Sequence, residues 1–81
     1  MNIEIKMHAI VALLEDVPTE HFDTGAPLTL RRGQIGTVVM TYDGSAFEVE
    51  FSDAQGRAFA MLPVATSKLI LLHDAPANVA A

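Results

Sequence analysis

The chain has 81 residues, which is enough for one domain, and its ten acidic and five basic side chains give a formal charge of −5. This acidic balance disfavours nucleic-acid binding, because neutralising phosphates requires a basic stripe. The chain contains no cysteine, so disulfides and thiolate metal sites are excluded. Small domains have narrow stability and 51% of these residues are hydrophobic, so we expect a homo-oligomer.

No apolar run approaches the roughly 20 residues of a membrane span, so we expect no membrane association. Residues 1–8 carry two charged side chains and no long apolar core, unlike a secretory signal. We therefore expect a cytoplasmic location and a single domain over residues 1–81. Its ordered core should cover about residues 9–73, followed by a flexible tail of small residues at 74–81.

The first apolar run, residues 9–14, has a length that favours a buried strand, although alanine and leucine also suit a helix. Residues 16–32 show little periodicity and predict a long loop, in which residues 28–30 pair locally. A connection of this length within a small domain is usually functional or contains short irregular structure.

The central block predicts two strands, residues 35–42 and 47–51, joined by the turn 43–46. Strict alternation in the second strand indicates one buried face. A four-residue loop would place Tyr42 opposite Phe47 and Met40 opposite Val49. The side chains expected on the opposite, outer face are those of Thr37, Val39, Thr41, Glu48 and Glu50.

The sequence after the second strand predicts a three-residue loop at residues 54–56. Gly56 should have a positive φ, and Asp53 should face Arg57. Phe51 then faces Phe59, and the small or apolar residues Ala58, Ala60 and Leu62 fall on the outer face. Pro63 should end that strand, because proline cannot donate a ladder hydrogen bond. A short helical turn at 65–67 and a final strand at 69–72 complete the chain.

This order predicts an all-β fold that resembles a small five-stranded SH3-like barrel with one short 3-10 turn before the last strand. Phe47, Phe51 and Phe59 should point inward together. The apolar run 69–72 suits a strand that is covered on both sides, either by curvature of the barrel or by a second subunit.

Three blocks of the chain carry a resemblance to a known family: residues 10–18, residues 32–39 (Arg-Gly-Gln-Ile-Gly-Thr-Val-Val) and residues 47–51. In order and spacing they resemble a family of short bacterial proteins catalogued only as a domain of unknown function. The resemblance implies no catalytic residue, and such proteins look like accessory-genome cargo, which suggests partner binding. Residues 32–39 alone are also similar to the barrel of the nitrile hydratase β subunit and to ribosomal SH3-like modules.

No residue pattern predicts catalysis, a cofactor or a metal. The serines have no nucleophile motif around them, and the three histidines lack ligand spacing. Gly33 and Gly36 are followed by a strand rather than a helix, so Gly33 indicates a turn and Gly36 a bulge or a close approach, rather than a phosphate loop. Arg31 and Arg32 point to opposite sides, so we expect a solvated turn, or a pair with Asp16, Glu20 or Asp23, rather than a clamp for an anion.

Two regions are predicted to bind partners. Val39, Ala60 and Leu62 form an expected outward apolar patch that allows close approach of another surface. The second region consists of the loop 16–32 and the turn that begins at residue 43, and its expected partner-binding residues are Arg32, Tyr42 and Asp43. We therefore expect a non-catalytic interaction module that self-associates and has a protein partner of unidentified kind. The alternatives are a regulatory or toxin–antitoxin-type component that contacts nucleic acid, and an accessory subunit of a metal enzyme.

Overall fold

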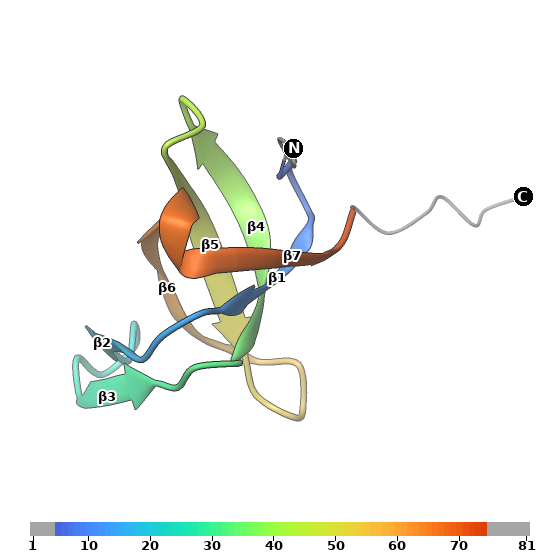
Figure 1. The fold of residues 1–81 in the computed structure, drawn as a ribbon. Helices are drawn as coiled ribbons and strands as arrows, with labels where there is room; N and C mark the ends of the chain where they lie inside the picture. The colour runs from blue at the N-terminus through green and yellow to red at the C-terminus, as the bar shows by residue number, and fades with distance from the viewer. Residues whose placement is uncertain (1–4, 75–81) are drawn as a thin grey trace, which may run out of the picture.

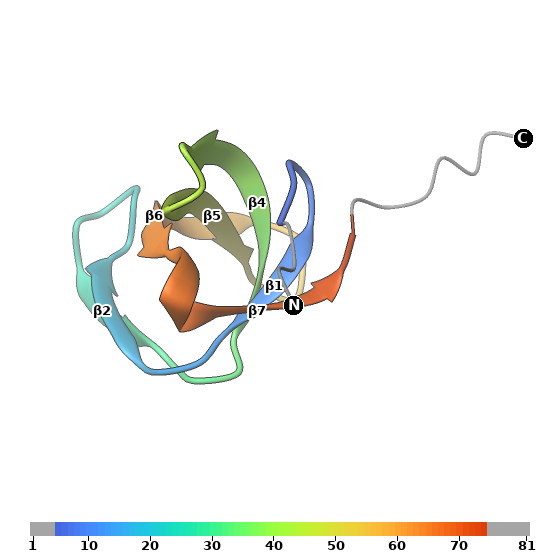
Figure 2. The same cartoon turned by 45° about the horizontal axis from the view of Figure 1, so that its top comes forward.

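The computed structural model describes residues 5–74 as an all-β domain, as predicted (Figure 1). A five-stranded sheet with the order β6-β5-β4-β1-β7 bends around the core, and β2 and β3 form a separate hairpin (Figure 2). A 3-10 turn precedes the last strand, which also confirms the prediction. The elements are β1 (Ile10–Leu13), β2 (Val17–Glu20), β3 (Pro27–Leu30), β4 (Ile35–Tyr42), β5 (Ala46–Ser52), β6 (Ala58–Ala65), η1 (Thr66–Lys68) and β7 (Leu69–His73).

The loop predicted over residues 16–32 is instead the β2–β3 hairpin, so β2 was missed. Each of its strands has four residues and contains a proline, and these features hide a strand pattern. Val17 pairs with Leu30 and Glu20 with Pro27, which confirms that residues 28–30 pair locally. The Phe22 N–H donates to the Phe59 C=O at 3.0 Å and ties the hairpin to β6.

The core lies inside the bend of the sheet. Phe51, Leu13, Leu30, Val11, Val38 and Val49 are its largest fully buried side chains. They come from β1, β3, β4 and β5, so burial of apolar surface joins the hairpin to the main sheet. Phe47 is also buried, whereas Phe59 is half-buried against the edge of the core, so the predicted inward aromatic group is largely confirmed.

The predicted β4–β5 register was wrong near the turn. Tyr42 pairs with Ala46 and Met40 with Glu48, so the connection is one residue shorter than predicted. A register shift between Val38 and Met40 restores Val38 to the buried face. Met40 and Tyr42 consequently point outward and are exposed.

The β5–β6 turn was predicted correctly, but the strand after it was not. Gly56 has a φ of 81°, and the Asp53 N–H donates to the Arg57 C=O at 2.8 Å. A register shift at Phe51/Ser52 then places Phe51 opposite Ala60 instead of Phe59. The strand also continues past Pro63, which β6 tolerates because it is an edge strand and needs no donor on its outer side.

The last strand, β7, pairs with β1 and forms the other edge of the sheet. In Figures 1 and 2 its C-terminal end runs clear of the other strands. The predicted tail 74–81 lies outside the described residues except for Asp74, which is exposed. Within residues 5–74 no helix has the length and apolarity needed to cross a membrane.

Candidate functional site

The structure does not bring the predicted partner-binding residues together. Arg32 lies before the first residue of β4, and Tyr42 is the last residue of that strand. The strand rise separates the two ends of β4 by roughly 23 Å. Arg32 therefore belongs to one end of the sheet, and Tyr42 with Asp43 to the other.

The side chains at the Tyr42 end bond to their own neighbours. The Tyr42 hydroxyl donates to Glu48 Oε1 at 2.9 Å, and this hydrogen bond raises the pKa of Tyr42. The hydroxyl and backbone N–H of Ser45 donate to Asp43 Oδ1 at 2.6 and 3.2 Å, and they hold the pKa of that carboxyl below its ordinary value. Asp43 itself has a φ of 44°. These residues therefore shape the turn.

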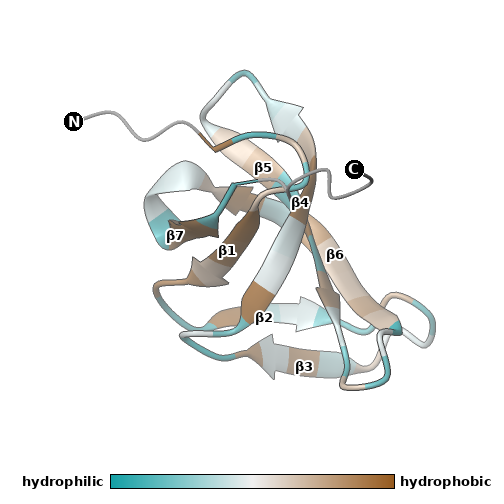
Figure 3. Ribbon diagram, turned by 90° about the vertical axis from the view of Figure 1, so that its right-hand side faces the viewer, coloured by the Kyte–Doolittle hydropathy of each residue, from teal (hydrophilic) through white to brown (hydrophobic). Residues whose placement is uncertain are grey.

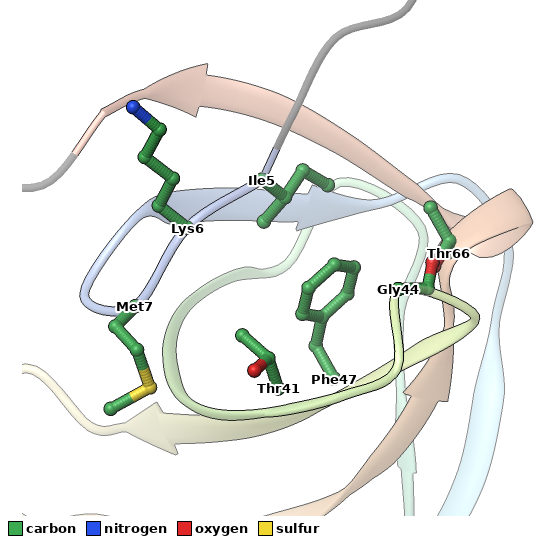
Figure 4. A pocket seen from close by; sticks show the side chains of 7 residues that line it. All are labelled: Ile5, Lys6, Met7, Thr41, Gly44, Phe47 and Thr66. Carbon is green, nitrogen blue, oxygen red and sulfur yellow. The ribbon is translucent and has the colours of Figure 1, made fainter.

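A pocket of about 390 Å³ opens beside this turn. Figure 4 shows Phe47 and Ile5 at its floor, while the Lys6 side chain points away from it. The Thr66 hydroxyl on its wall already donates to the Gly44 C=O at 2.8 Å. The described polar groups around the pocket thus do not converge on a ligand position.

At the other end, Asp16 holds the chain segment that enters β4. Its Oδ1 accepts the Arg32 backbone N–H at 2.8 Å, and its Oδ2 lies 3.4 Å from Arg31 Nη1. This confirms Asp16 among the predicted partners of the two arginines. The backbone hydrogen bond from Arg32, followed by the charge of Arg31, holds the pKa of Asp16 below its ordinary value of 3.8.

Asp16 should make the folding stability depend on pH in the acid range. A lowered folded-state pKa means that its contribution is complete above the ordinary value and is lost as pH falls through the lowered value. Asp16→Asn should therefore lower the melting temperature at pH 7, and the difference from the wild type should shrink toward pH 2. Circular dichroism melts across this range test the prediction, with Glu15→Gln as the control. A difference that persists unchanged at pH 2 would contradict it.

The predicted outward patch is not on the outside. Ala60 is fully buried, and Leu62 packs against the core, because the register shift in β6 reverses their orientation. Val39, at the register shift in β4, is half-buried. The prediction that Ala60 and Leu62 present a contact surface was wrong. Met61 and Pro63 take the outward positions instead.

A different apolar surface lies outward on the sheet, over β1, β7 and the start of β4. Ala12 pairs with Ile35 on one side and with Ile70 on the other, so the three side chains form a row across three strands. Ile35 is 55% exposed, Ile70 48% and Leu72 42%. Figure 3 shows the corresponding hydrophobic colour on β1 and β7. We call Ile10, Ala12, Ile35, Ile70 and Leu72 the β1/β7 outer surface.

The sequence contained one signal for this surface. Residues 69–72 are apolar at every position, although a strand with one solvent-exposed face would alternate apolar and polar residues. Leu69 faces the core, whereas Ile70 and Leu72 face solvent. Isolated exposed apolar side chains are ordinary, but a row that runs to an edge strand is typical of an interaction surface.

The comparisons with known proteins identify a family without an assigned activity. The chain matches no curated protein and no solved structure with significance. A family model matches residues 7–71, which include the β2–β3 hairpin, strands β1, β4, β5 and β6 and the first three residues of β7. The chain thus belongs to the family described as Domain of unknown function (DUF4926).

Proposed function

We propose that this domain is a non-catalytic interaction module of the SH3-like barrel type that self-associates through the β1/β7 outer surface. The fold assignment is supported by the order of elements: a strand, a hairpin, a three-strand meander, a 3-10 turn and a last strand that returns beside the first. One observation carries the functional proposal. The apolar row Ile35–Ala12–Ile70 lies on the outer face of the sheet and runs to the edge strand β7, with Ile35 and Ile70 exposed on either side of the buried Ala12.

A second copy of the chain is the occupant that fits this surface best. An acidic chain needs an apolar contact to offset repulsion between copies, and the β1/β7 outer surface contains no charged side chain. The cations do not supply an alternative surface for nucleic acid. Arg31 lies within 4 Å of Asp16, and Arg57 lies in the β5–β6 turn, away from Lys68 next to β7.

Ile70→Lys should shift the protein toward monomer. The substitution places a charge in the proposed contact, and it lowers the net negative charge, which by itself would favour association. We expect the apparent Kd for self-association to rise at least about tenfold, the size of effect found at a central interface residue. Sedimentation velocity over a concentration series measures it.

Met61→Lys provides the matched control. Met61 is 42% exposed on β6 and lies opposite Glu50, away from β7. This variant introduces the same charge and should associate like the wild type. A wild-type protein that stays monomeric at millimolar concentration would overturn the proposed function, as would equal association by both variants.

A further inference from the structure

The two edges of the main sheet differ in their protection. The β6 edge is covered by the hairpin through the hydrogen bond from Phe22 to Phe59, and it contains Pro63. Prolines and covering loops are devices that keep sheet edges from pairing with other chains. β7 has no proline, and no strand among residues 5–74 pairs with its outer side.

The backbone of Leu71 points to the open side of β7. The Leu14 N–H donates to the Lys68 C=O at 2.9 Å, so the backbone of Lys68 turns toward β1. Hydrogen bonding alternates along an antiparallel ladder, and Ile70 opposite Ala12 is the next residue that turns toward β1. The N–H and C=O of Leu71, one residue further, therefore turn outward.

We propose that two copies pair β7 to β7 in antiparallel orientation, centred on Leu71, and thereby join their sheets across a two-fold axis. This arrangement rests on the proposed self-association and places the contact at the β7 edge of the β1/β7 outer surface, where Ile70 and Leu72 lie. The two Leu71 residues exchange N–H to C=O hydrogen bonds. Ile70 lies opposite the partner's Leu72, so their exposed side chains cover one another on the outer face.

Charge complementarity selects this register. With Leu71 at the centre, Lys68 of one copy faces the partner's Asp74, and symmetry repeats the pair. Outward-facing backbone groups alternate along β7 up to Leu71, so the centre can shift only to Leu69; His73 pairs with Ile10 and turns toward β1. Centring on Leu69 would place Lys68 opposite Ile70. That shift leaves a charge against an apolar side chain.

The register shift between Ile10 and Val11 limits the length of this ladder. It inserts one extra residue into β7 relative to β1 and increases the local twist at the C-terminal end of the strand. Only a few backbone hydrogen bonds can therefore form between the two copies. We infer that the apolar contact of Ile70 with the partner's Leu72, flanked by the two ion pairs, supplies most of the association.

Cysteine cross-linking tests the register directly, because the natural chain contains no cysteine. Residue 70 and the partner's residue 72 form a non-hydrogen-bonded pair with Cα atoms about 4.5 Å apart, which is within disulfide range. Two copies of residue 70, or of residue 72, are diagonal neighbours about 7–8 Å apart and bridge poorly. A mixture of I70C and L72C chains should form a mixed disulfide dimer at least about tenfold faster than either variant alone. Equal rates in all three samples would overturn the register.

A charge-swap cycle tests the ion pairs independently. Lys68→Glu makes the chain more acidic and Asp74→Lys makes it less acidic, yet each should raise the dissociation constant roughly tenfold by placing like charges together. The double variant K68E/D74K should restore wild-type association. Arg57→Glu, in the distant β5–β6 turn, is the control for net charge. If the wild type associates but neither single variant weakens association, this geometry is wrong and the proposed self-association stands. A monomeric wild type would overturn both.

Discussion

Replacing Phe51 with alanine should lower the free energy of unfolding by about 3–5 kcal/mol. Phe51 is fully buried near the C-terminal end of β5, opposite Ala60 of β6 and beside Gly36 of β4, and it is the largest fully buried side chain in the described core. The loss is large because truncation removes apolar burial and leaves a cavity that neighbouring strands cannot close. A domain of this length has a total stability of roughly 4–12 kcal/mol, so a substantial fraction of the variant should be unfolded.

Urea denaturation followed by circular dichroism measures this effect. Met61→Ala is the matched control, because Met61 lies on the neighbouring strand but faces solvent. Its free energy of unfolding should stay within about 0.5 kcal/mol of the wild type. If the two substitutions had equal effects, the inward orientation of the β5 aromatic side chains would be incorrect.

Gly36→Ala should destabilise the domain by about 3 kcal/mol, the upper end of the range for an overpacked core. A Cβ at this position would lie 2.6 Å from Val49 Cγ1, 2.8 Å from Phe51 Cε1 and 3.0 Å from the Glu50 C=O. Two of these neighbours are packed core side chains and the third is backbone, so none can move away without cost. Of the bulge and the close approach that the sequence indicates for Gly36, the close approach is therefore confirmed, and it explains the glycine at the second, buried position of β4.

Two comparisons separate crowding from backbone strain at Gly36. Gly33 has a φ of 90° but open space around its Cβ position, so Gly33→Ala should cost roughly 1–2 kcal/mol through strain alone. Gly36→Ala should also cost less in a Val49→Ala background, which removes one of the clashing atoms. The melting temperatures of these variants measure both differences. A Gly36→Ala variant as stable as the wild type would rule out the packing of β4 on β5 described above.

The sequence predicted the elements better than their orientation. Alternation over residues 47–51 identified both the strand and its buried face, because each inward aromatic or valine is flanked by a polar residue. Residues 38–40 and 58–62 are apolar or small at consecutive positions, so either face could have been buried. Each segment also contains a register shift, which inverts the orientation beyond it and leaves no trace in composition.

Because of the same ambiguity, the surface predicted to bind a partner is not the surface that the structure exposes. Ala60 and Leu62 alternate with Met61, and the sequence alone does not indicate which set faces solvent. Ile70 and Leu72 belong to an unusually continuous apolar run in the sequence, which indicates a strand covered either by curvature of the barrel or by a second subunit. Ile35 could not be assigned to the same surface, because its pairing with Ala12 is a long-range contact between β4 and β1.

Amide hydrogen exchange at Leu71, measured at low and high protein concentration, tests β7 pairing most directly. If two copies pair through this edge, the Leu71 amide should exchange rapidly in dilute solution and become protected as the dimer forms, while the outward-facing amides of β6 stay unchanged. Concentration-independent exchange at Leu71 in a sample that sedimentation shows to be dimeric would contradict pairing through β7.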